Sequence, residues 1–148
     1  MVDFLSIKDC IAGQTEKMIE LERLLCSIPA LAPESDGDGE LKKCEALQAF
    51  LQKLGFTQFE HFDAPDSRVS SGIRPNLVVT IPGKDDTQRV WIMAHTDVVP
   101  PGELAKWKGD PWTLVQEGDK LIGRGVEDNQ QGLVSAVFAA YAFIAMGI

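Results

Sequence analysis

Two short motifs in the second half of the chain carry side chains that could bind a metal ion. In the first, His95 and Asp97 directly follow an apolar run, RVWIMA, at residues 89–94. On an extended backbone, residues two apart point to the same side. A neutral imidazole could therefore bind a metal while the carboxylate fixes its tautomer and raises its basicity. By itself, this spacing is more often that of a hydrogen-bonded structural pair.

The second motif is the segment GRGVEDN at residues 123–129. Its glycines allow a tight turn and would bring Asp128 to the start of a helix. A carboxylate there could bridge two cations, or it could be an ordinary helix N-cap. A dinucleotide-binding turn is a third interpretation, because G-x-G follows an apolar strand. It is disfavoured, since Asp128 stands where a third glycine is needed and its charge would repel a pyrophosphate.

Other polar and aromatic residues near these motifs have simpler interpretations. His61 matches no motif and is expected to be structural or exposed. Glu127 directly precedes Asp128, and consecutive residues at a helix start do not face one point. We therefore interpret it as a first-turn acid favoured by the helix dipole, and not as a catalytic base. Trp107 and Trp112 are expected to pack their loop onto the domain, with the rim of a pocket as the alternative.

A framework of helices and buried strands must position these motifs. Apolar residues at helical spacing predict one helix over 7–27 and a second over 41–54, which Gly55 would end. A third helix is predicted from residue 127 or 128 to the end. The segments rich in β-forming residues predict strands at 56–62, 76–81 and 89–94, the last two as neighbours, and a hairpin over 113–122. Helices alternating with buried strands indicate a layered α/β domain.

The last sixteen residues, LVSAVFAAYAFIAMGI, carry no charge. A membrane span is one interpretation, because such a span needs about 18–20 apolar residues. A helix that is apolar on all sides is also typical of one buried inside a large α/β protein. We favour the buried helix.

Composition excludes several classes of function. A chain of 148 residues with 45% hydrophobic residues can bury one core, which predicts a single domain. A formal charge of −8 argues against nucleic acid and anionic membranes as partners. The three cysteines have neither C-x-x-C spacing nor nearby histidines, so we interpret them as reduced thiols. The N-terminus has no secretory signal pattern, and we expect a cytoplasmic protein.

The motifs, in this order and spacing, resemble the co-catalytic zinc hydrolases that include acetylornithine deacetylase, succinyl-diaminopimelate desuccinylase, aminoacylase, carboxypeptidase G and the carnosine-type dipeptidases. The resemblance covers nearly the whole chain. It rests on IPALAPE at 28–34, RPNL at 74–77, AHTDVVP at 94–100, Trp107, DPW at 110–112, and GRG at 123–125 followed by Asp128. One departure follows Asp128: the family often has a Lys-Gly pair, whereas Gln130 and Gln131 precede Gly132 here.

The resemblance implies a role for each matching residue. His95 would be the first metal-ligating histidine, Asp97 the catalytic-site carboxylate that orients it, and Asp128 the aspartate that bridges two metals. The peptide bond after Asp128 would be cis. The cofactors would be two divalent ions, with zinc preferred and cobalt or manganese possible.

The resemblance also implies a fold and an activity. The fold would be a three-layer, zinc-peptidase-like α/β domain with a mainly parallel sheet. Residues 1–148 would be its N-terminal portion, without the general base, the other ligands or the lid and dimerisation domain. The full-length protein, potentially a homodimer, would hydrolyse an amide bond in N-acyl amino acids or small peptides, and the fragment would be inactive. The alternative is a small non-catalytic binding domain, complete at this length.

Overall fold

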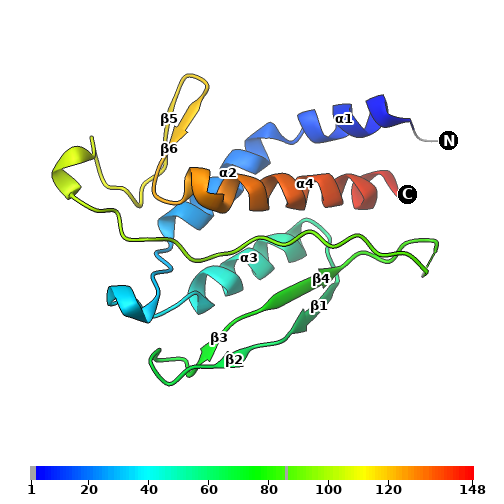
Figure 1. The fold of residues 1–148 in the computed structure, drawn as a ribbon. Helices are drawn as coiled ribbons and strands as arrows, with labels where there is room; N and C mark the ends of the chain where they lie inside the picture. Colours follow the sequence, from blue (N-terminus) through cyan, green and yellow to red (C-terminus); the bar gives the residue numbers. More distant parts are fainter. Residues whose placement is uncertain (1–2, 86) are drawn as a thin grey trace.

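The computed structural model describes residues 3–85 and 87–148 (Figure 1). Its helices are α1 (Phe4–Ala12), α2 (Thr15–Ser27), α3 (Leu41–Lys53) and α4 (Gln131–Met146), with short 3-10 turns at Pro33–Ser35 and Leu104–Lys106. The helix predicted over 7–27 is thus two helices. Asp3 caps the start of α1 by accepting a hydrogen bond from the Ser6 backbone N–H (2.7 Å), and Gly13 follows the last residue of the helix.

The core lies between the helices. Helix α4 packs alongside α1 and α2, and α3 packs against α2 (Figure 1). The buried side chains at this junction are apolar: Leu21, Leu25, Leu47, Phe50, Leu51, Phe56, Leu133, Val134 and Phe138. The predicted stop of α3 is confirmed, since Gly55 follows the helix with a φ of +96°. The uncharged α4 therefore supplies one wall of the core.

The strands form antiparallel pairs. β1 (Gln58–His61) pairs with β4 (Leu77–Thr80), β2 (Ala64–Pro65) with β3 (Ile73–Arg74), and β5 (Val115–Glu117) with β6 (Lys120–Ile122). The α/β class and the hairpin over 113–122 are confirmed. The mainly parallel sheet is not found, because every strand pair in the described residues is antiparallel and two-stranded.

The strand predicted at 89–94 is the clearest error. This segment has no regular secondary structure, and Figure 1 shows it as a long coil running past the helices. Its expected neighbour, β4, pairs with β1 instead. Val90, Trp91, Ile92 and Met93 are 61–92% exposed. A strand with apolar side chains on both faces needs a backbone partner and a cover on each side, and the described residues supply neither.

The start of α4 also differs from the prediction. The helix begins at Gln131, and Val126–Gln130 forms an irregular turn in which Asp128 and Asn129 have non-helical backbone angles. Asp128 is therefore not an N-cap of α4. Within residues 3–85 and 87–148, no helix has the length and apolar character to cross a membrane.

Two charged side chains are buried beside the core. Glu22 on α2 is 3% exposed and Lys43 on α3 is 1% exposed. Burial raises the pKa of Glu22 to about 7, an effect that the charge of Lys43 partly offsets. Burial likewise lowers the pKa of Lys43 to about 8. In the described residues, Glu22 Oε2 and Lys43 Nζ have no hydrogen-bond partner. Both side chains therefore pay a desolvation cost when charged.

Replacing Glu22 by glutamine tests this cost. The folded protein holds the Glu22 proton more tightly than the unfolded chain, whose pKa is near 4.5. The stability contributed by this group is therefore fully present below about pH 4.5 and is lost as pH rises through about 7. Glu22→Gln should raise the free energy of unfolding by about 1–3 kcal/mol at pH 8, and by much less at pH 5.

The measurement is urea unfolding of the wild type and the variant at both pH values, followed by circular dichroism. Glu20→Gln removes an exposed carboxylate from the same helix and is the matched control. A Glu22→Gln effect that is equal at pH 5 and pH 8 would contradict the prediction.

Candidate metal centre

His95 and Asp128 meet although they lie 33 residues apart in the sequence. Nε2 of His95 is 3.2 Å from Oδ1 of Asp128. His95 follows the unpaired segment at 89–94, and Asp128 sits in the turn before α4. The expected proximity of the two side chains is confirmed. Their role as metal ligands stays a prediction. The peptide bond between Asp128 and Asn129 is cis, as the resemblance implied.

The other ring nitrogen of His95 faces Asp97. Nδ1 is 3.1 Å from the Asp97 carbonyl oxygen and 3.2 Å from its carboxylate Oδ1. Burial disfavours protonation of His95, but the contacts with Asp97 and Asp128 outweigh it and raise its pKa above the usual value. A ring held this way at Nδ1 directs Nε2 toward Asp128. This is the arrangement expected if Asp97 orients a ligating histidine.

The geometry of His95 fits a cation. A neutral imidazole has one N–H, yet both of its nitrogens here face oxygen atoms that accept hydrogen bonds. The nitrogen without a proton would repel its oxygen neighbour unless a second proton or a metal ion lay between them. A nitrogen and a carboxylate oxygen form a donor set suited to zinc. The residues present therefore fit a divalent metal.

Packing brings the two segments together at Val98 and Gly125. The Val98 N–H donates to the carbonyl of Ala30 (3.0 Å), which anchors the segment just after Asp97. Gly125 has a φ of +85°, and a Cβ atom placed on it would lie 2.4 Å from Val98 Cγ1. Only a glycine allows this approach without displacing its neighbour. The turn that carries Asp128 thus packs directly on the segment that carries His95.

Gln130 is a residue whose role the sequence did not reveal. It is 2% exposed, and its backbone N–H donates to the carbonyl of Gly125 (3.0 Å). Its amide Nε2 would lie 2.9 Å from a Cβ on Gly125. The Gln130 side chain therefore packs beneath the turn as a support. In the sequence it is only a departure from the family pattern, and no single-sequence signal marks it as buried.

The site is open and incomplete within the described residues. The side chains of His95, Asp97 and Asp128 are 44%, 48% and 87% exposed. No group of three or more His, Cys, Asp or Glu residues suited to holding a metal occurs in residues 3–85 and 87–148. His61, as expected, lies outside the site and contacts Gln48 Oε1 at 2.9 Å. This part of the chain therefore brings together two of the predicted ligands, His95 and Asp128.

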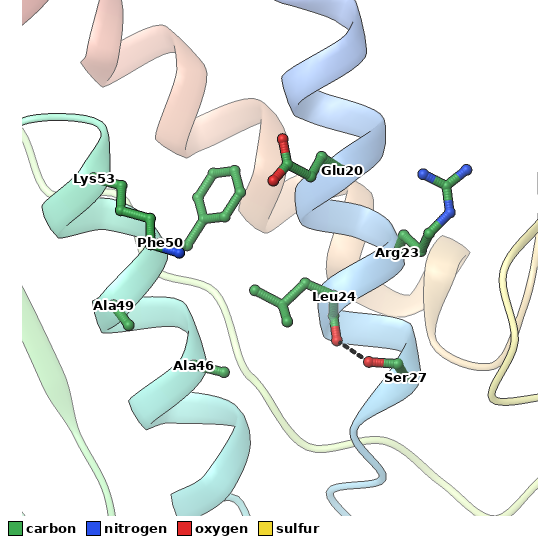
Figure 2. A pocket seen from close by; sticks show the side chains of 8 residues that line it. All are labelled: Glu20, Arg23, Leu24, Ser27, Ala46, Ala49, Phe50 and Lys53. Carbon is green, nitrogen blue, oxygen red and sulfur yellow. Dashed lines mark hydrogen bonds between the residues drawn. The ribbon is translucent and has the colours of Figure 1, made fainter.

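A surface groove lies away from this site. It has a volume of about 460 Å³ and lies between α2 and α3, with Leu24 and Phe50 among its lining residues (Figure 2). Glu20, Arg23 and Lys53 stand around it (Figure 2). It shares no residue with the His95–Asp128 pair.

Comparison with known proteins identifies the family. Residues 91–148 match the family described as Peptidase family M20/M25/M40. A protein of Methanocaldococcus jannaschii named as an uncharacterized metallohydrolase is 34% identical over 127 residues, which cover 82% of this chain. A similarly named metallohydrolase of Methanococcus maripaludis is 33% identical over 132 residues. Residues 91–148 thus belong to the M20/M25/M40 peptidase family. His95, Asp97 and Asp128 all lie within the matched residues, whereas the chain spans only 30% of each relative.

Solved structures agree with the family assignment. The dipeptidase Dug1p of Saccharomyces cerevisiae superimposes with a TM-score of 0.76 at 24% identity, covering 97% of this chain and 31% of Dug1p. Human carnosine dipeptidase 1 gives a TM-score of 0.75 at 25% identity, covering 95% of this chain and 31% of the dipeptidase. The M20-family chain thus has the fold of one part of these longer enzymes.

Replacing Gly125 by alanine tests whether stability depends on the close packing of the turn on Val98. The left-handed backbone costs about 1–2 kcal/mol for an L-residue, and the clash with Val98 should add about 1–3 kcal/mol. Gly118→Ala is the matched control, because Gly118 also has a positive φ (+63°) but no atom within 4 Å of its Cβ position. Urea unfolding should show a larger loss of stability for Gly125→Ala than for Gly118→Ala. Equal losses would remove the packing argument.

Proposed function

We propose that the full-length protein is a metal-dependent hydrolase that cleaves an amide bond in N-acyl amino acids or small peptides. The observation that supports this most directly is the contact of His95 Nε2 with Asp128 Oδ1, at 3.2 Å, on an open face of the chain. The family is one of peptidases, and two structural neighbours are described as dipeptidases. A site open to solvent suits a small substrate that must reach the ligands.

Each residue of the site has a distinct task in this proposal. His95 and Asp128 are ligands, and Asp128 is the bridging carboxylate. Asp97 holds the Nδ1 side of His95 and so keeps Nε2 directed at the metal. Two divalent ions, preferably zinc, would polarise the scissile carbonyl and lower the pKa of a bound water. Cobalt or manganese would tolerate the same ligands.

The general base does not come from this segment in our proposal. Glu127 is exposed and lies in the turn beside Asp128, and Glu103 and Glu117 contact lysines: Lys106 at 2.9 Å and Lys108 at 3.9 Å. Residues 1–148 would then be an incomplete catalytic domain. The remaining ligands, the base and a dimerising lid domain would be supplied by other parts of a longer polypeptide. We further propose a cytoplasmic location. Given the charge of −8, we propose no role for nucleic acid or membranes as partners.

Ligand substitutions test the proposed metal site. In the full-length protein, His95→Ala and Asp128→Asn should each remove bound zinc and lower hydrolysis by more than about 100-fold, because each deletes a ligand. Asp97→Asn should weaken zinc binding by about 10–100-fold, since it perturbs only the orientation of His95. Zinc is measured by elemental analysis and hydrolysis with a panel of N-acyl amino acids and dipeptides.

His61→Ala is the matched control for loss of a histidine, because His61 contacts Gln48 and not the site. It should retain zinc and activity. Full activity of the Asp128→Asn variant would exclude the proposed mechanism.

The incompleteness of the chain gives a second test. Residues 1–148 expressed alone should bind zinc weakly and show no hydrolysis, because affinity depends on a full, preformed ligand set. The exposed residues 90–93 should also promote self-association. Zinc content, oligomeric state by light scattering and turnover are compared with those of the full-length protein. A monomeric, zinc-loaded and active 148-residue chain would refute the proposal that the base lies elsewhere.

A further inference from the structure

A second contact joins the two segments that carry the metal-site residues. The carbonyl oxygen of Pro101 accepts hydrogen bonds from Trp107 Nε1 (2.9 Å) and from Arg124 Nη2 (3.3 Å). The Arg124 guanidinium also lies over the Trp107 ring, with its central carbon 5.3 Å from the ring centroid. The three residues therefore form a closed set of contacts, which we call the Arg124 clasp.

The clasp lies close in sequence to both halves of the site. Pro101 comes four residues after Asp97, and Arg124 comes four residues before Asp128. The backbone N–H of Arg124 donates to the carbonyl of Pro111 (2.8 Å), and the buried Cys26 thiol contacts the same oxygen at 3.5 Å. One end of the clasp is therefore fixed to the domain. Its other end holds the loop that continues from His95 and Asp97.

Arginine is chemically specific in this position. Its planar guanidinium can stack on an aromatic face and donate hydrogen bonds in its plane at the same time. A lysine ammonium could be attracted to the ring but could not reproduce both contacts in one geometry. The indole is also bifunctional here, because its face receives Arg124 while its N–H reaches Pro101. Each partner thus constrains the other.

We propose that Arg124 and Trp107 are positioning residues that set the separation between His95 and Asp128. The inference rests on the proposed metal-dependent function and assigns a role to two residues outside the proposed ligand set. Val98 and Gly125 form the contact on one side of the site, and the clasp forms the second. A second contact removes rotations between two segments that a single contact leaves free.

The test uses Arg124→Lys, Trp107→Leu and Trp107→Phe in the full-length protein. Zinc affinity, measured by competition with a chromogenic chelator, should fall by about 10–100-fold in Arg124→Lys and Trp107→Leu, as for other residues that orient ligands. Catalysis should show a lower kcat with a KM changed by less than about threefold, because the substrate contacts remain. Trp107→Phe keeps the ring face and should recover part of both losses.

Two controls separate positioning from general stability. Arg23→Lys changes an exposed arginine on α2 and should leave zinc affinity unchanged. The double variant Arg124→Lys/Trp107→Leu should be no weaker in zinc affinity than the worse single variant, because one clasp can be lost only once. All measurements are made where circular dichroism shows each variant to be folded. Folded variants with wild-type zinc affinity and kcat, or with additive losses, would overturn the proposal.

The failure of the clasp and the failure of the proposed function give different results. If the wild-type protein neither binds zinc nor hydrolyses any amide, the proposed function fails. The clasp is then judged on crystal structures of the zinc-free wild type and Trp107→Leu. The His95 Nε2 to Asp128 Oδ1 distance should increase beyond 3.2 Å in the variant. An unchanged distance would overturn the clasp.

Discussion

The imidazole of His95 lies between oxygen atoms on both sides, and the proposed function depends on this contact. Asp97 lies against Nδ1 and Asp128 against Nε2, although a neutral ring can donate only one hydrogen bond. An added positive charge, whether a proton or a metal ion, would stabilise this arrangement. The raised pKa of His95 reflects the same excess of acceptors. The related chains are named metallohydrolases, and in our proposal a divalent metal ion supplies this charge.

The contact is local, but the structure that supports it is not. Helices α2, α3 and α4 share one apolar core, and the turn carrying Asp128 is continuous with the first residue of α4. Gln130 is buried beneath that turn. The Val98 N–H donates to the carbonyl of Ala30, which lies three residues after the end of α2. The position of Asp128 is therefore fixed by the helical core, and His95 is brought to it by a loop anchored at several points.

The segment before His95 contrasts with this order. Residues 90–93 are strongly apolar yet exposed, and they pair with no strand in the described part of the chain. The relatives are about three times as long as the matched region. In our proposal, the longer polypeptide that supplies the base also covers this segment. Metal binding and burial of residues 90–93 would then both depend on contacts with that polypeptide.

The sequence alone determined the parts of this structure that depend on local chemistry. Apolar spacing predicted α3 with its end at Gly55, the hairpin formed by β5 and β6, and the strand β1, because helix periodicity and turn residues act over a few positions. It also identified His95 and Asp128 as a pair, because the order and spacing of several motifs together resembled one family.

Tertiary structure decided what depends on distant partners. Strand propensity predicted a strand at 89–94, but a strand exists only where another backbone accepts its hydrogen bonds, and β4 has β1 as its partner instead. The helical pattern extended α4 back to Asp128, whereas packing of Gly125 on Val98 and Gln130 imposes an irregular turn there. The placement of the Arg124 guanidinium over the Trp107 ring and the burial of Gln130 are likewise decided only by folding.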